Sequence, residues 1–282
     1  MTPRAAITGR TALYGVVGHP VTHSRSPQMH AAAFAALGID ATYVALPVAP
    51  DALEVAVRGA HALGFQGLNV TVPHKQPALR LCRTVDPVAA RIGAVNTLRR
   101  LDAGWEGFNT DALATRSLLA EAGLARGARA LLLGAGGAAR AGAWALLELG
   151  AELCILARRE AAAAELAGAL TAPGRPRPRI ATFAALADEA ARADVVVNGT
   201  SVGLHGHEPR FEGLRFRGGQ LAMDFVYGAT AFAADARAAG ARLVSGEAIL
   251  VRQGALAFTL WTGRTAPEAD MAAAVAASGS ST

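Results

Sequence analysis

The sequence is poor in aromatic residues, in charged residues and in cysteine. Phe, Trp and Tyr make up 5% of its 282 residues, and Asp, Glu, Lys and Arg together make up 17%. Hydrophobic residues reach 52%, so the chain can bury a sizeable core, and an intrinsically disordered protein is excluded. Because Cys82 and Cys154 are the only cysteines, a disulfide framework is excluded as well, and we expect two reduced thiols.

Segments that would place the chain in a membrane are also missing. No stretch of 18 residues is unbroken apolar, and a membrane-spanning helix needs about that length. The first ten residues, MTPRAAITGR, contain no apolar signal core, so we expect a cytoplasmic protein. The formal net charge is +5, but no basic run is interleaved with aromatic residues, which argues against nucleic acid as a partner.

The histidines show no metal-binding pattern. His19, His23, His30 and His74 are scattered, without the spacing of a motif such as H-E-x-x-H. We therefore expect structural or peripheral histidines and no metal site.

Short apolar strands alternate with helical patterns along almost the whole chain. Continuous apolar strands indicate parallel sheets that helices cover on both faces. The expected strands are residues 12–17, 42–48, 67–72, 94–99, 129–133, 152–156, 194–198, 220–224 and 241–244. The expected helices are residues 27–37, 51–63, 111–123, 137–149, 160–170, 230–239 and 246–263.

We expect two domains. A new unit of strand, glycine-rich turn and helix begins at residue 129, which is how a nucleotide-binding domain opens. The last long apolar helix has no strand after it, so it needs a face elsewhere to bury. We therefore predict a first domain over residues 1–110, completed by residues 246–282, and a nucleotide-binding domain over residues 111–245.

The most informative motif is LLLGAGGAAR at residues 131–140. It fits the dinucleotide-binding pattern G-x-G-x-x-G/A, directly after a strand and at the start of a helix. The first glycine permits the tight turn, the second lets the backbone approach a pyrophosphate, and the small third residue lets helix and strand pack closely. Free N–H groups at the helix start would hold the phosphates. The residues expected there are Gly134, Ala135, Gly136, Gly137 and Ala138.

The choice of cofactor is predicted from the end of the next strand. An NAD site usually carries an acidic residue there, about twenty residues after the glycines. Here the strand ELCIL is followed by Arg158 and Arg159, whose guanidinium groups suit a 2′-phosphate. This favours NADP, although Glu160 follows directly and leaves some use of NAD open.

Polar residues in the first domain could bind or transform a small ligand. Lys75 follows the strand that ends LNVTVP, and ligands of open α/β sheets bind outside the carboxyl ends of strands. Taken alone, Lys75 fits a solvated loop better. Ser24 and Ser26 precede a helix that opens with Pro27, which suits a carboxylate but also fits plain capping by Ser26.

Two more polar residues stand where a ligand would lie. Asn96 interrupts the apolar strand GAVNTL, and a buried Asn must find partners, so we expect a ligand or a backbone network there. Asp111 starts a helix, where it fits a cap or, beside Lys75, a group that orients the ammonium.

Seven stretches, in order, resemble the shikimate dehydrogenase family. They are GHPVTHSRSPQMHAAAF, NVTVPHK, GAVNTL, GFNTD, GAGGAAR, NGTSVGL and GEAILVRQGALAFTLWTG, and they extend from about residue 13 to residue 263. The resemblance implies an α/β enzyme of two domains, an N-terminal three-layer α/β substrate domain and a Rossmann-type dinucleotide-binding domain, with a cleft between them. It also implies NADPH-dependent, reversible reduction of 3-dehydroshikimate to shikimate in the chorismate pathway to the aromatic amino acids.

The resemblance also assigns roles to single residues. Lys75 would donate and accept the proton at the reacting oxygen, with Asp111 as its partner. Ser24 and Ser26 would bind the substrate carboxylate, and Tyr227 would close on the substrate from the cofactor side. The remaining expected substrate contacts are Thr71, Asn96 and Gln253. The remaining expected cofactor contacts are Arg158 at the 2′-phosphate, Arg159, Thr200, Phe225 and Gly246.

Some alternatives stay open. The substrate could be quinate or an aminated shikimate analogue, with NAD or NADP, because such ligands differ by one or two polar ring groups. A folate-linked dehydrogenase is disfavoured by the Ser24–Ser26 pair, and a non-catalytic sensor by the presence of Lys75 and Asp111. The family often carries YNPxxTPL where this chain has the shorter YGATAF. A homodimer is also compatible with the sequence.

Overall fold

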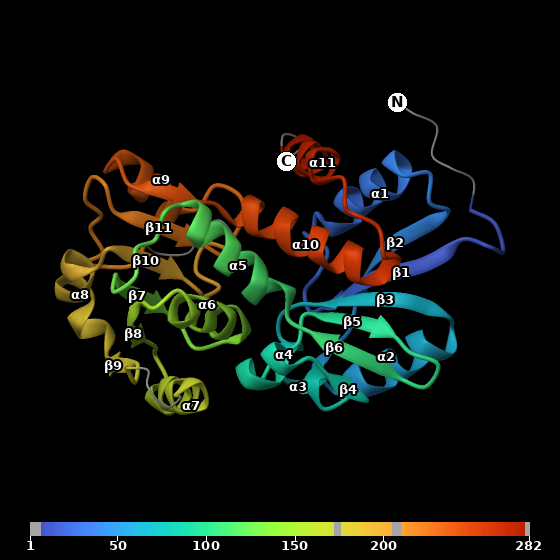
Figure 1. The fold of residues 1–282 in the computed structure, drawn as a ribbon, viewed down its shortest axis with the longest axis horizontal. Helices are drawn as coiled ribbons and strands as arrows, with labels where there is room; N and C mark the ends of the chain where they lie inside the picture. The colour runs from blue at the N-terminus through green and yellow to red at the C-terminus, as the bar shows by residue number, and fades with distance from the viewer. Residues whose placement is uncertain (1–6, 172–175, 205–209, 280–282) are drawn as a thin grey trace. The chain divides into compact units, whose positions relative to one another are not determined.

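The computed structural model describes residues 7–171, 176–204 and 210–279, which fold into two compact units (Figure 1). The first unit runs to Thr110 and takes in the chain again from Leu250, and the second comprises Asp111–Ile249. Each unit is built on a six-stranded sheet.

The sheet of the first unit has the strand order β2-β1-β3-β5-β6-β4. Its strands are β1 (Ala12–Gly18), β2 (Ala41–Pro47), β3 (Phe65–Val70), β4 (Thr84–Val85), β5 (Thr97–Arg100) and β6 (Trp105–Phe108). β1 is parallel to β2 and β3, but β5 is antiparallel to both β3 and β6. The expectation of parallel sheets is therefore wrong for this unit. The β5–β6 connection is too short for the crossover that parallel strands need, and Leu101 N–H donates to the carbonyl of Gly104 to close it at 3.0 Å.

Helices cover both faces of the first sheet (Figure 1). One face carries α1 (Ser26–Ala36), α11 (Glu268–Gly279) and the part of α10 (Gly246–Thr262) that begins at Leu250; the other carries η1 (Pro50–Ala52), α2 (Leu53–Ala62), α3 (Lys75–Leu79) and α4 (Pro87–Ile92). Successive side chains of a strand point to opposite faces of the sheet, so each strand contributes to the core on both sides. Val16 packs with Phe34 and Phe258 in one core cluster, whereas Val17 packs with Leu53 in the other.

An aromatic cluster seats α10 on the first sheet. Trp261 donates its indole N–H to the carbonyl of Leu98 at 3.0 Å. His30 stacks on Tyr43 with ring centroids 4.4 Å apart, and burial lowers the pKa of His30 to about 3. His30 is therefore a neutral core residue, held by aromatic packing.

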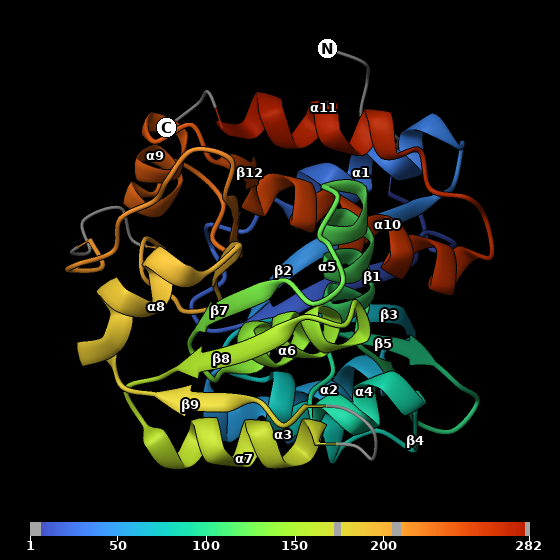
Figure 2. The same ribbon diagram turned by 60° about the vertical axis from the view of Figure 1, so that its left-hand side comes forward.

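The sheet of the second unit has the order β12-β11-β10-β7-β8-β9 and is parallel throughout. Its strands are β7 (Arg129–Leu133), β8 (Glu152–Leu156), β9 (Arg179–Ala181), β10 (Val195–Asn198), β11 (Leu221–Asp224) and β12 (Arg242–Val244). Figure 2 shows β7, β8 and β9 lying side by side. The order reverses between β7 and β10, as it does in a Rossmann-type fold.

Helices also lie on both faces of the second sheet. They are α5 (Thr110–Glu121), α6 (Gly137–Glu148), α7 (Glu160–Leu170), η2 (Phe183–Ala185), α8 (Leu186–Arg192) and α9 (Ala231–Ala238). Leu131 and Leu133 of β7 pack with residues of α8 and α9. The intervening Leu132 faces α6, where a Cβ on Gly142 would lie 3.6 Å from its Cδ1. The expected α/β fold with a Rossmann-type unit is confirmed.

The described residues bear on three features that the sequence was expected to lack: a membrane-spanning helix, a metal site and a disulfide. Within them, no helix is both long and apolar enough to cross a bilayer. No group of three His, Cys, Asp or Glu side chains in this part of the chain could hold a metal ion. Both cysteines are free thiols, and burial raises the pKa of Cys82 to about 12 and that of Cys154 to about 11.

Candidate functional site

The glycine turn of the second unit joins β7 to α6. Gly134 has φ +106°, a backbone conformation that residues other than glycine rarely adopt. A Cβ at this position would also lie 3.0 Å from the carbonyl oxygen of Gly199 and 3.0 Å from Cγ2 of Thr200. The turn after β7 and the loop after β10 therefore pack against each other, and Gly134 is required by both its backbone and its neighbours.

Gly136 is a glycine for a different reason. It occupies the N-cap position of α6 at φ −81° and ψ −171°, which any residue can adopt. A Cβ there would meet no protein atom within 4 Å, so packing in the unit does not demand a glycine. The first N–H groups of a helix have no partner within the helix, and they attract phosphate. An exposed, unobstructed Gly136 beside them fits the close approach of a pyrophosphate.

This turn lies at the switch point of the sheet. β7 pairs with β8 on one side and with β10 on the other, and ligands of open α/β sheets bind where the strand order reverses. Thr200 lies in the loop after β10, where its hydroxyl donates to Asn198 Oδ1 at 2.7 Å and accepts from Val202 N–H at 3.1 Å. Its side chain therefore shapes this loop, and a direct cofactor contact by Thr200 stays a prediction.

Arg158 and Arg159 follow β8, the strand next to β7. Both are exposed, and Glu160 begins α7 directly after them. Among the described residues, neither guanidinium takes part in an ion pair or side-chain hydrogen bond, so both are available to an anion. Their place beside the glycine turn is the place of the ribose in a Rossmann-type fold.

Gly246 packs against the backbone of Val226 and Tyr227, whereas the Phe225 ring lies against Gly142 of α6. A Cβ on Gly246 would lie 2.4 Å from the carbonyl oxygen of Val226, so a larger residue would push this segment away. Glu247 accepts from Gly228 N–H through Oε1 at 2.7 Å. Gly246 therefore has a packing role, and its expected contact with the cofactor stays a prediction.

The two serines of the first unit lie at the start of α1. Ser26 is the first residue of the helix, and Arg25 occupies the N-cap position without a capping side chain. The expected cap by Ser26 is therefore wrong by one position. Ser24 Oγ accepts from Ser26 N–H at 3.3 Å, which brings both hydroxyls to the same helix end.

Lys75 is not a loop residue. β3 ends at Val70, two residues before the expected end, and Lys75 begins α3. The carbonyl of Lys75 accepts from Val95 N–H at 2.9 Å, and its side chain is half-buried. Thr71 fixes the connection, because its carbonyl accepts from His74 N–H at 2.9 Å. Asp111 is buried in the first turn of α5, and its pairing with Lys75 stays a prediction.

Asn96 and Gln253, which are far apart in sequence, are joined in a buried network. Asn96 lies directly before β5 rather than inside a strand, and its Nδ2 donates to Gln253 Oε1 at 3.3 Å and to Thr110 Oγ1 at 3.0 Å. Its Oδ1 accepts from Thr110 N–H at 2.7 Å. The expectation was a ligand or a backbone network; the partners in the structure are mostly side chains, and a ligand contact of Asn96 stays a prediction.

Asn69 is a polar residue of this network that the sequence reasoning missed. It is 5% exposed, its Oδ1 accepts from the Tyr43 hydroxyl at 2.8 Å, and its Nδ2 donates to the carbonyl of Asn96 at 3.2 Å. The signal was available, because Asn69 is the Asn of LNVTVP and raises, in an apolar strand, the same question as Asn96.

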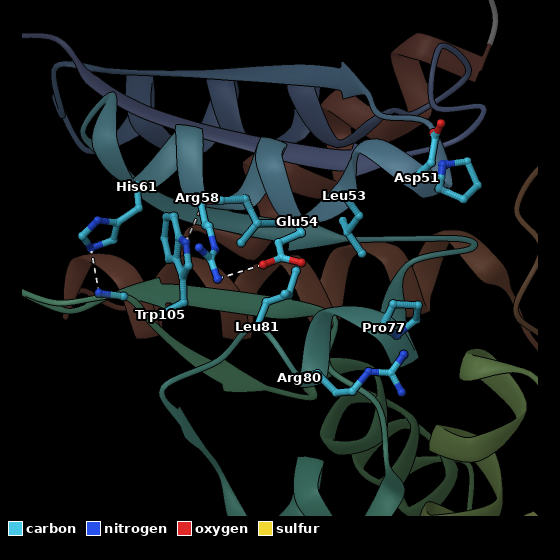
Figure 3. Close-up of a pocket in the computed structure, with 12 residues that line it drawn as sticks. Asp51, Leu53, Glu54, Arg58, His61, Pro77, Arg80, Leu81 and Trp105 are labelled. Atoms are coloured by element: carbon cyan, nitrogen blue, oxygen red, sulfur yellow. Dashed lines mark hydrogen bonds and ion pairs between the residues drawn. The ribbon is translucent and has the colours of Figure 1, made fainter.

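A cavity of about 650 Å³ lies elsewhere in the first unit, and no expected site residue lines it. Figure 3 shows it between α2 and the chain that carries Pro77, Arg80 and Leu81. Two of its charged side chains form an ion pair, since Arg58 Nη2 lies 2.8 Å from Glu54 Oε1. The cavity is thus apart from the residues expected to carry chemistry.

The parallel sheet of the second unit and the open glycine cradle at its switch point define a dinucleotide-binding α/β protein. Residues 16–98 match the shikimate dehydrogenase substrate binding domain, and residues 246–276 match the shikimate 5′-dehydrogenase C-terminal domain. The shikimate dehydrogenase (NADP(+)) of Anaeromyxobacter sp. (strain K) is 69% identical over 273 residues, 96% of this chain and 98% of that protein. The chain belongs to the shikimate dehydrogenase family.

Solved structures agree with this assignment. Shikimate dehydrogenase from Aquifex aeolicus has a TM-score of 0.86 at 33% identity, covering 96% of this chain and 99% of that chain. Shikimate 5-dehydrogenase from Thermus thermophilus, in complex with NADP(H) and shikimate, has a TM-score of 0.81 at 36% identity, covering 95% of this chain and 99% of that chain.

Proposed function

We propose that this chain catalyses the reversible, NADPH-dependent reduction of 3-dehydroshikimate to shikimate, a step toward the aromatic amino acids. The observation that carries the proposal is its 69% identity, over nearly its whole length, to a shikimate dehydrogenase (NADP(+)). The open backbone at Gly136 and the two exposed arginines after β8 support NADP as the cofactor.

The first unit is proposed to bind the substrate. Ser24 and Ser26 hold its carboxylate, while Thr71, Asn96 and Gln253 receive its ring hydroxyls. The Asn96–Gln253 hydrogen bond supports this assignment, because it fixes both amides before a ligand arrives. A pocket that must pair each hydroxyl discriminates strongly against a ring that lacks one.

Lys75 is proposed to handle the proton of the reaction. NADP, when bound, supplies the hydride acceptor for shikimate oxidation. Lys75 takes the hydroxyl proton at the reacting oxygen as the carbonyl forms and returns it in the reverse direction, and Asp111 orients its ammonium group. Help of this kind typically contributes about 10²–10⁴-fold.

The second unit is proposed to bind NADP. Residues Gly134–Ala138 hold the pyrophosphate, Arg158 and Arg159 hold the 2′-phosphate, and Thr200, Phe225 and Gly246 border the nicotinamide side. Tyr227 closes on the substrate from that side. We further propose that the enzyme is cytoplasmic. Whether it is a homodimer is measured by light scattering, which gives the mass of the protein in solution.

The proposal is tested by product identification. Purified protein is mixed with 3-dehydroshikimate and NADPH, and both the loss of nicotinamide absorbance and the formation of shikimate are followed. We expect one NADPH to be consumed for each shikimate formed. Binding of both ligands without turnover would favour the sensor alternative and contradict the proposal.

A further inference from the structure

Asp224 is a buried carboxylate outside the residues assigned above. It ends β11 and is 1% exposed. Its Oδ1 accepts from Asn198 Nδ2 at 2.9 Å and from Val226 N–H at 3.0 Å. Its Oδ2 accepts from the Thr230 hydroxyl at 2.6 Å. Three donors, one from the end of β10 and two from the segment between β11 and α9, thus converge on a single side chain.

One of the two loops involved follows β10 and carries Thr200. Asn198 links it to Asp224, because the same amide that donates to Asp224 accepts through Oδ1 from the N–H and the hydroxyl of Thr200. Asn198 Nδ2 also reaches the carbonyl of Val202 at 3.3 Å. The loop is therefore shaped around Asn198, and Asn198 is held in turn by Asp224.

The other loop is Phe225–Thr230, which carries Tyr227. Val226 N–H and the Thr230 hydroxyl fix its two ends to the carboxylate of Asp224. Thr230 is also the N-cap of α9, where its Oγ1 accepts from Ala233 N–H at 3.0 Å. Thr230 therefore closes the short YGATAF segment, in which the prolines common in the family are missing.

Burial of this carboxylate is costly, and the structure retains it. The pKa of Asp224 is raised to about 6, because desolvation, with a smaller contribution from nearby Glu247, outweighs the bonds from Thr230, Val226 and Asn198, which lower it. A neutral side chain would avoid the cost of burying a charge. Retention of a costly polar group fits a geometric role better than a contribution to stability.

We propose that Asp224 is a positioning residue that holds the Thr200 loop and the Tyr227 loop in register for the bound cofactor and substrate. It touches neither ligand and acts through Asn198 on one loop and through Thr230 and Val226 on the other. The inference rests on the proposed function, since that proposal assigns the cofactor to Thr200 and the substrate to Tyr227.

The test separates the two loops by their ligands. Asn198→Ala releases only the Thr200 loop, and we expect the Kd for NADPH, measured by its fluorescence, to rise about tenfold. Thr230→Val releases only the Tyr227 loop, and we expect the Kd for shikimate in the presence of NADPH, with which shikimate does not react, to rise by a similar factor when measured by calorimetry. Asp224→Ala should raise both.

Two further variants distinguish positioning from general loosening. Asp224→Asn keeps the Oδ1 acceptor for Asn198 and Val226, and its Nδ2 can donate to the Thr230 hydroxyl oxygen in place of the bond that Oδ2 accepts in wild type, so both affinities should stay within about twofold of wild type. Gln220 lies at the other end of the same strand region, is 1% exposed, and donates through Nε2 to the carbonyls of Ala190 and Ala193. Gln220→Ala should lower thermal stability and leave both affinities unchanged.

The outcomes are decisive even if Asp224→Ala does not fold, because the two single-loop variants carry the test. Wild-type affinities in Asn198→Ala and Thr230→Val would overturn the inference, and so would equal losses in Gln220→Ala. A wild-type protein that binds NADPH but does not turn over shikimate would refute the proposed function while leaving the NADPH arm of this test intact.

Discussion

Gly199 and Ala139 are in such close contact that a Cβ on Gly199 would lie 2.8 Å from Cα of Ala139. Ala139 is the small third residue of the glycine motif, in the first turn of α6, and Gly199 follows β10. The motif residue that is expected to let helix and strand pack closely is therefore packed against the loop of a neighbouring strand. Packing within the unit therefore requires a glycine at position 199, whereas Gly136, where a Cβ would meet no protein atom within 4 Å, is a glycine that a ligand would require.

Gly136→Ala should fold like wild type and bind NADP weakly. The added methyl group meets no protein atom within 4 Å, so the free energy of unfolding should change by less than about 1 kcal/mol. The same methyl would stand in the path of the pyrophosphate, and we expect the Kd for NADPH to rise about tenfold. Gly199→Ala is the matched control and should lose about 1–3 kcal/mol of stability. Unchanged NADPH affinity in Gly136→Ala would argue against this cradle.

Arg158→Ala and Arg159→Ala test the preference for NADP. Hydrogen bonds to charged groups contribute about 1.5–3 kcal/mol, so loss of one that binds the 2′-phosphate should raise the KM for NADP about tenfold or more. The KM for NAD, which lacks that phosphate, should not change. Arg192→Ala, another exposed arginine in the same unit, serves as the control. Equal changes for NADP and NAD would contradict the assignment.

Asp224→Asn should change how stability depends on pH. The pKa of Asp224 is raised from its ordinary value of 3.8 to about 6, so the folded state holds its proton more tightly than the unfolded state. The carboxyl therefore costs nothing below about pH 4, and its cost grows to about 3 kcal/mol as the pH rises through 6. Urea unfolding should show the stability of the variant relative to wild type increasing by about that amount between pH 4 and pH 7. A difference that is constant with pH would count against the buried charge.

Lys75→Ala should lose turnover and keep substrate binding. If Lys75 transfers the proton, kcat should fall about 10²–10⁴-fold, while the Kd for shikimate changes little. Arg80→Ala removes an exposed cation five residues further on, at the edge of the cavity in Figure 3, and should keep wild-type activity. Turnover of Lys75→Ala near that of wild type would remove Lys75 from the mechanism.

Elements with uninterrupted local signals were predictable from the sequence. β7, β8 and α7 have the expected bounds, residues 129–133, 152–156 and 160–170. Each is a buried strand or an alanine-rich helix between clear turns, so local propensity and tertiary packing agree. The Rossmann-type class of the second unit, though not its strand order, followed from such elements.

The elements around β5 were not predictable from apolar patterning alone. The expected strand at residues 94–99 began too early, because α4 (Pro87–Ile92) ends directly before it in a turn at Gly93. Asp86 caps this helix, with Oδ1 accepting from Val88 N–H at 2.8 Å. The sequence Asp-Pro was a usable signal, since Asp is a favoured N-cap and Pro a favoured first helical residue.

The candidate site was predictable as a set of residue types rather than as an arrangement. Asn96 attracted attention because it is polar in an apolar stretch, but its partner Gln253 is 157 residues away. No local pattern announces such a pair. The same holds for Asp224, which reads as an ordinary strand end and is tied to Asn198 only by the pairing of β10 with β11.

The central claim is the reaction itself, and the most direct test is nicotinamide absorbance. Purified protein is mixed with shikimate or quinate, each with NADP or NAD. We predict rapid reduction of the nicotinamide with shikimate and NADP, and much slower reduction in the other three mixtures. Silence in all four mixtures from a folded protein would contradict the account.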